Sequence, residues 1–100
     1  MNNSAQHTDR QPPGRVELRL AELGLVLPRP PKAIGNFIYG VEIPGMLVVS
    51  GTYGTAVDAD DNDVLPYRGK VGSDLSVSEG YQSARLAALN LLAMAKAVIG

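Results

Sequence analysis

The chain has 100 residues, of which 45% are hydrophobic and 19% charged, and its formal net charge is −1. This length corresponds to one domain with a small core, and the composition is that of a globular rather than a disordered protein. The nearly balanced charge argues against nucleic acid as the main partner, because phosphate binding requires a basic surface. The chain has no cysteine, which excludes disulfides and thiolate chemistry.

The sequence shows no targeting or membrane segment. The first ten residues lack the apolar core of a signal peptide, and the best candidate for a membrane span, residues 86–99, is interrupted by Asn90 and Lys96. We therefore expect a cytoplasmic protein without membrane contact. Residues 1–14 are polar and end in Pro-Pro-Gly, which predicts a disordered tail before a single domain over residues 15–100.

The first predicted element is a short amphipathic helix over residues 15–23, with Gly24 placed to end it. A brief extended segment is expected at residues 25–27. The Pro-Arg-Pro-Pro sequence at residues 28–31 then predicts a stiff, extended linker. A ligand for an SH3-type domain is the less favoured interpretation of these prolines.

A β-hairpin is predicted next. Residues 36–43 alternate between apolar and other side chains, Pro44-Gly45 is a turn signal, and residues 46–49 (Met-Leu-Val-Val) are typical of a strand buried on both faces. The tight turn would bring Phe37 and Tyr39 toward the Ser50 end of the second strand.

Ser50 and Gly51 follow the most apolar run of the chain, residues 46–49, and provide a hydroxyl group and a residue without a side chain. A ligand could approach the main chain there. On these residues alone, a plain strand ending is the favoured interpretation.

The stretch 53–66 is predicted to be an acidic loop. Asp58, Asp60 and Asn62 have the spacing of a calcium loop, but Asp63 stands where that loop needs Gly and Gly69 where it needs Glu. We therefore expect a solvated acidic hairpin tip and no metal site. A short strand is predicted near residues 67–71.

The last predicted element is a long helix from Val77 to about Ile99. Ser76 and Glu79 form a capping box at its start, and Gly100 is suited to its end. The stripe predicted to pack on the sheet comprises Tyr81, Ala84, Ala88, Leu91, Ala95 and Val98. The fold class expected from these elements is α+β, an antiparallel sheet covered by a long helix.

Three segments together resemble the RidA/YjgF family, also known as endoribonuclease L-PSP. They are the strand ending in Val49-Ser50-Gly51, the Gly69-Lys-Val-Gly72 segment, and Ala88-Leu-Asn-Leu-Leu92 in the long helix. The closest branch begins with a helix like Leu20-Ala-Glu-Leu-Gly24. The resemblance covers residues 15–100.

The resemblance implies a chorismate-mutase-like fold, here only its N-terminal part, assembled as a homotrimer with small-molecule pockets. It implies a hydrolase that uses water, and no cofactor, to deaminate enamines and imines such as 2-iminopropanoate and 2-iminobutanoate. Family members continue beyond this helix with the carboxylate-binding arginine and the catalytic acid, so the catalytic residues of this chain stay unknown. Ribonuclease activity gains no support, because the sequence has no basic groove and no histidine pair.

The resemblance also implies a set of ligand-binding residues. Ser50 and Gly51 fall on the pocket serine and glycine, and Phe37 falls where catalytic members carry tyrosine. Tyr39 and Tyr53 could border the same pocket.

Three hypotheses remain open at this stage. The first is an imine deaminase acting on small 2-imino acids. The second is a non-catalytic module that binds a small carboxylate and forms homo-oligomers through its exposed sheet. The third is an inactive, truncated product.

Overall fold

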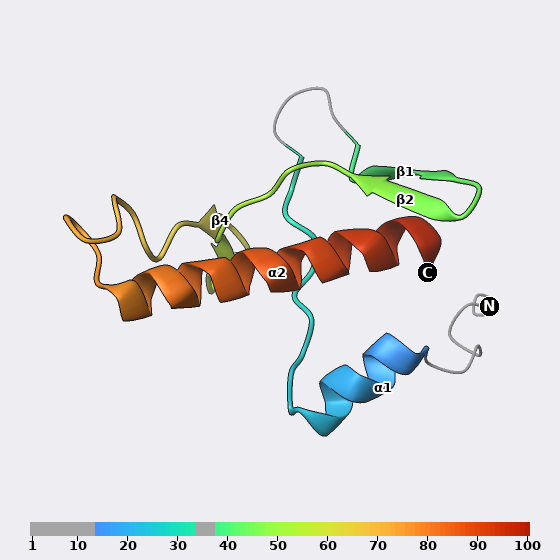
Figure 1. Cartoon of the computed structure of the whole chain (residues 1–100), viewed down its shortest axis with the longest axis horizontal. Helices are drawn as coiled ribbons and strands as arrows, with labels where there is room; N and C mark the ends of the chain where they lie inside the picture. Colours follow the sequence, from blue (N-terminus) through green and yellow to red (C-terminus); the bar gives the residue numbers. More distant parts are fainter. Residues whose placement is uncertain (1–13, 34–37) are drawn as a thin grey trace.

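The computed structural model describes residues 14–33 and 38–100 and contains two helices and four short strands in this part of the chain (Figure 1). The elements are α1 (Arg15–Glu22), β1 (Gly40–Ile43), β2 (Met46–Val49), β3 (Ala56–Val57), β4 (Asp63–Val64) and α2 (Val77–Ile99). Strands β1 and β2 form one antiparallel hairpin, β3 and β4 form another, and α2 packs against the first. The fold is therefore small and α+β, as predicted. Of the tail predicted over residues 1–14, residues 1–13 lie outside the described residues, as does Phe37, and Gly14 is the N-cap of α1.

Both helices form where local signals predicted them. Helix α2 begins with the expected capping box, in which Ser76 Oγ accepts from the Glu79 amide at 3.1 Å and Glu79 Oε1 accepts from the Ser76 amide at 2.9 Å. It ends at Ile99 and is capped by Gly100, whose φ of +79° suits glycine. Helix α1 ends at Glu22 and is followed by Gly24 with a φ of +71°. Neither helix has the length and apolar character to cross a bilayer in the part of the chain that the structure describes.

The β1–β2 hairpin has the predicted turn and register. Ile43 pairs with Met46 across the turn and Gly40 pairs with Val49 at the open end. The Ser50 amide donates to the Tyr39 carbonyl at 2.9 Å, which brings these two residues together as expected. Strand β1 is shorter than predicted, because Ile38 and Tyr39 precede it without strand geometry, and residues 36 and 37 lie outside the described range.

The prediction that residues 46–49 form a strand buried on both faces is wrong for the single chain. Only Leu47 of β2 is half-buried. The register places two cross-strand pairs on the same face of the hairpin, and their four side chains are 43–60% exposed: Val41, Ile43, Met46 and Val48. We call this surface the outer hairpin face. It is exposed because the hairpin is a two-stranded sheet and the helix that packs against it leaves this face open.

The middle of the chain also differs from the prediction. Residues 53–66, predicted to be a loop, contain the β3–β4 hairpin, whereas residues 67–71, predicted to be a strand, form none. Val71 makes only an isolated bridge with Leu75. Residues 25–27 likewise form no strand.

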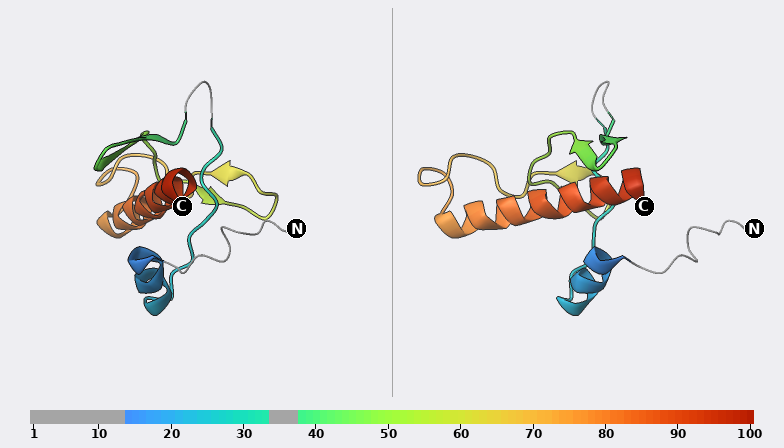
Figure 2. Two further views of the ribbon diagram at one scale, coloured as in Figure 1. Left: turned by 90° about the vertical axis from the view of Figure 1, so that its right-hand side faces the viewer. Right: turned by 45° about the vertical axis from the view of Figure 1, so that its right-hand side comes forward.

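The stripe of α2 predicted to be core is largely exposed. Tyr81, Ala84 and Ala88 face solvent, and the buried residues of the helix are Asn90, Ala93 and Met94. The face that packs is offset by one residue, because residues 54 and 55 lie against Ser83 and Asn90. Helix α1 lies on the side of α2 opposite the β1–β2 hairpin (Figures 1 and 2). In the described residues, the buried apolar side chains are few: Leu20, Ala93 and Met94.

Candidate functional site

A pocket of about 240 Å³ lies where the proline-rich segment, the end of the first hairpin and helix α2 meet. Its walls include Lys32, Tyr39, the stretch 51–53 and Asp63, and Met94 contributes a buried apolar surface. A concave site with apolar walls and a few polar groups is the usual form of a small-molecule site. We call it the central pocket.

The residues singled out from the sequence are distributed unevenly around the central pocket. Gly51, Tyr39 and Tyr53 line it. Ser50 is not among its lining residues, and its hydroxyl donates to the Ile38 carbonyl. The Ser50 side chain therefore helps to close the hairpin. Phe37 lies outside the described residues.

Asn90 of α2 fixes the wall of the central pocket. Its buried amide nitrogen donates to the Tyr53 carbonyl at 3.1 Å, to the Thr55 carbonyl at 3.0 Å and to Thr55 Oγ1 at 3.0 Å. Asn90 thus supplies a donor to the buried carbonyl and hydroxyl of Thr55, and adds a second donor to the Tyr53 carbonyl, which also accepts from the Thr55 amide at 2.8 Å. Asn90 thereby holds residues 53–55 against the helix.

Gly54 allows the same segment to approach the helix closely. A Cβ atom on Gly54 would lie 2.5 Å from Ser83 Oγ and 2.6 Å from the Ser83 carbonyl oxygen. Because both distances are below van der Waals contact, only glycine fits there without movement.

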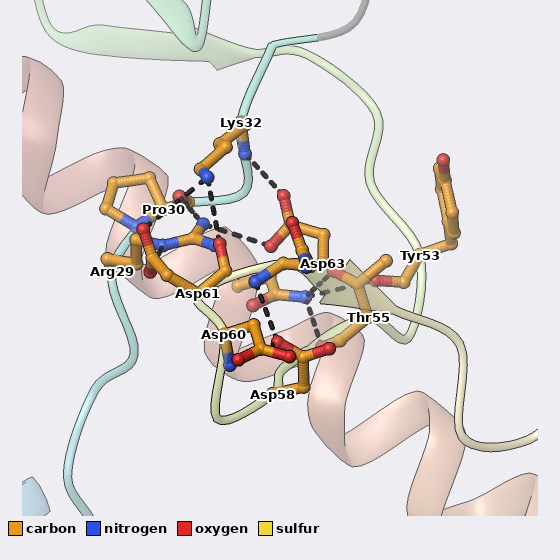
Figure 3. A network of polar contacts seen from close by, with 11 residues as sticks. Arg29, Pro30, Lys32, Tyr53, Thr55, Asp58, Asp60, Asp61 and Asp63 are labelled. Atoms are coloured by element: carbon orange, nitrogen blue, oxygen red, sulfur yellow. Dashed lines mark hydrogen bonds and ion pairs between the residues drawn. The ribbon is translucent and has the colours of Figure 1, made fainter.

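A cluster of ion pairs joins the proline-rich segment to the β3–β4 hairpin (Figure 3). Arg29 Nε donates to Asp61 Oδ1 at 2.8 Å, Nη2 donates to the Asp61 carbonyl at 2.8 Å, and Nη1 donates to Asp63 Oδ1 at 3.0 Å. The hydrogen bond and charge of Arg29 lower the pKa of the Asp61 carboxyl below its ordinary value, and Asp61 in turn raises the pKa of Arg29. We call this cluster the Arg29 clasp.

Lys32 contributes twice to the contact between these segments. Its backbone amide donates to Asp63 Oδ2 at 2.8 Å, and its Nζ donates to the Asp61 carbonyl at 2.8 Å and lies 3.5 Å from Asp61 Oδ2. The predicted linker is therefore anchored, and the predicted solvated tip carries Asp63 with a side chain only 17% exposed.

The calcium-like spacing in the tip has a backbone explanation. Asp58 Oδ1 accepts from the amides of Asp60 and Asn62, both at 2.9 Å, which is a local turn stabilised by an aspartate side chain. Across residues 14–33 and 38–100, no group of three acidic or histidine side chains is placed to hold a metal ion.

A second hollow adjoins the central pocket and shares three of its residues, Tyr53, Thr55 and Asp63. It is bordered by Arg68. Lys32 and Arg68 are thus the cationic side chains that line the two hollows on either side of a common wall.

Sequence reasoning missed Lys32, Asp63 and Asn90. A signal existed for Asn90, a polar residue inside an apolar helical stretch, and for the two cations around Pro30 and Pro31, which complement the acidic tip in charge. Neither signal identifies the partner residues, which lie 29 to 37 positions away in the sequence.

The chain matches no protein-family model, no curated protein and no solved structure.

Proposed function

We propose that the protein binds a small carboxylate, of the size of a 2-imino or 2-oxo acid, in the central pocket. The supporting observation is the pocket itself, which is lined by Lys32, by Gly51 and by the buried Met94. Its volume of about 240 Å³ suits a ligand of a few heavy atoms.

Each part of the pocket suits one part of such a ligand. An ammonium group attracts a carboxylate and can donate up to three hydrogen bonds. Gly51 has no side chain and nothing within 4 Å of the position of a Cβ atom, so a ligand can reach its backbone. Met94 offers a polarisable apolar surface to a short aliphatic side chain.

Imine hydrolysis is a second candidate, favoured by the Asp63 carboxylate in the pocket and by the RidA-like sequence segments. In this reaction water adds to the C=N carbon, and ammonia leaves as the C=O bond forms. A carboxylate could position the water. However, Asp63 Oδ1 accepts from Arg29 and Oδ2 from the Lys32 amide. Because both oxygens already have partners, binding without turnover is the function we favour.

We also propose that the protein forms homo-oligomers through the outer hairpin face. Four adjacent apolar side chains and two unpaired strand edges form a surface that favours association. A second copy offers a matching apolar surface.

Calorimetric titration with pyruvate, a stable analogue of the imino acid, tests binding. We expect saturable binding that Lys32→Gln weakens and that Lys70→Gln, which removes an exposed lysine away from the pocket, leaves unchanged. No binding by the unmodified protein would refute the proposal. Ammonia release from enzymatically generated 2-iminopropanoate tests the second candidate, and we expect none above the rate without protein.

A further inference from the structure

The ammonium group of Lys32 lies next to Asp61 and contacts both its backbone carbonyl and its carboxylate. Its Nζ is 2.8 Å from the Asp61 carbonyl oxygen and 3.5 Å from Asp61 Oδ2. Figure 3 shows the side chain reaching toward Asp61, with Tyr53 on the other side of Asp63. The cation of the central pocket therefore already has an anionic partner.

We propose that Asp61 competes with the ligand carboxylate for Lys32 and thereby sets the affinity and the charge selectivity of the central pocket. This inference rests on the proposed function. In it, the carboxylate of the ligand replaces the carboxylate of Asp61 as the counter-ion of Lys32.

The exchange leaves no charge without a partner. Asp61 keeps the Arg29 guanidinium, whose Nε donates to Oδ1 at 2.8 Å, on the oxygen that Lys32 does not approach. Arg29 is also held by Asp63 and by the Asp61 carbonyl, so the clasp does not depend on Lys32. The competition therefore concerns the two contacts that Lys32 Nζ makes with Asp61, one to its carbonyl and one to Oδ2.

The exchange also requires little movement. The backbone of Lys32 is fixed by the bond from its amide to Asp63, while its side chain is 57% exposed. An exposed lysine side chain changes rotamer on a picosecond-to-nanosecond timescale. Because the pair with Asp61 is exposed, it is weak enough for a ligand to displace.

The competition discriminates between ligands by charge. A ligand carboxylate can replace Asp61 as the counter-ion of Lys32. A neutral amide of the same shape forms a weaker hydrogen bond with the ammonium group than a carboxylate does, so it does not displace Asp61. Removing the charge of Asp61 should therefore tighten the binding of pyruvate and have little effect on that of pyruvamide.

The test compares Asp61→Asn with Asp60→Asn by calorimetric titration with pyruvate. Both variants remove one negative charge from the same tip, but Asp60 makes no contact with Lys32 in the described residues. We expect Asp61→Asn to lower the Kd about two- to five-fold, the size of an exposed ion pair, and Asp60→Asn to leave it unchanged. The gain should shrink in high salt.

A double-mutant comparison separates competition from a change in folding. On a Lys32→Gln background, Asp61→Asn should no longer tighten binding. Equal Kd values for both tip variants, or weaker binding by Asp61→Asn, would overturn the inference while leaving the proposed function intact. No pyruvate binding by the unmodified protein or any variant would overturn both.

Discussion

Two residues, Gly54 and Asn90, decide where the wall of the central pocket lies. Gly54 permits contact with the backbone of Ser83, and Asn90 donates to the buried Thr55 carbonyl and to the Tyr53 carbonyl. Neither acts on a ligand directly. Both convert an irregular segment into a fixed surface, which a preorganised binding site requires.

Gly54→Ala should destabilise the fold by about 1–3 kcal/mol, because the added methyl group overlaps Ser83 and forces the segment off the helix. Gly51→Ala is the matched control, since nothing lies within 4 Å of its Cβ position. Urea unfolding followed by circular dichroism measures both. Equal stability of the two variants would show that residues 53–55 do not pack on α2 as described.

Asn90→Ala should lower the free energy of unfolding by about 1–3 kcal/mol, because it leaves the buried Thr55 carbonyl and hydroxyl without the Asn90 donor. Gln82→Ala, on the exposed face of the same helix, should change the free energy of unfolding by less than about 0.5 kcal/mol. Thermal unfolding of the two variants provides the comparison, and a similar melting temperature for both would contradict the assignment.

At the scale of elements, the Arg29 clasp fixes the β3–β4 hairpin, whose strands have only two residues each and would be marginal alone. The clasp makes stability depend on pH. Because the pKa of Asp61 is lowered in the folded protein, its contribution is complete above the ordinary value of 3.8 and is lost as pH falls through the lowered pKa.

Arg29→Met should therefore reduce stability at neutral pH and flatten the loss of stability below about pH 4. Arg85→Met, which removes an exposed arginine of α2, should keep the acid sensitivity of the unmodified protein. Glu17, whose pKa is lowered by the hydrogen bond from Lys96 and then by that from the Gly14 amide, titrates equally in both variants. Melting temperatures between about pH 5 and pH 2 test this, and parallel curves would count against the clasp.

The sequence predicted those elements whose signals are local. The capping box of Ser76, the glycine after α1 and the Pro44-Gly45 turn each act within a few residues, and all three structures form. The prediction failed where partners are distant. Periodicity predicts a packed stripe that includes Tyr81. The face of α2 that packs is instead the one with Asn90, because it contacts residues 53–55, about 35 positions earlier in the chain.

The same limit applied to the candidate site. Tyr39, Gly51 and Tyr53 do meet at one pocket, because the hairpin register is local information. Lys32 and Asp63 join them through the direct bond from the Lys32 amide to Asp63 and through the Arg29 clasp, which both link segments more than 30 residues apart. The charges in the sequence show which segments can attract one another, but not which residues form the ion pairs.

On the scale of the whole molecule, an exposed apolar surface stands beside a small core. The outer hairpin face exposes four large side chains, while the buried apolar residues in the described part of the chain are Leu20, Ala93 and Met94. Burying the outer hairpin face against a second copy would add apolar burial that the single chain lacks.

Val48→Lys should convert an associating protein into a monomer, because it places a charge on the outer hairpin face. Val26→Lys is the control, since Val26 is 87% exposed and lies away from that face. Sedimentation velocity across a range of protein concentrations measures the difference. A monomer at all concentrations for the unmodified chain would refute association.

The position of Met94 has a chemical consequence. Its side chain is 1% exposed and lines the central pocket, while Met46 on the outer hairpin face is 60% exposed. Peroxide oxidises accessible thioethers to sulfoxides, so Met46 should react first and Met94 only when the pocket admits the oxidant. Peptide mass spectrometry gives the ratio of the two rates, and bound pyruvate should slow the oxidation of Met94 alone. The oxidation rate of Met94 would then measure whether the central pocket is occupied.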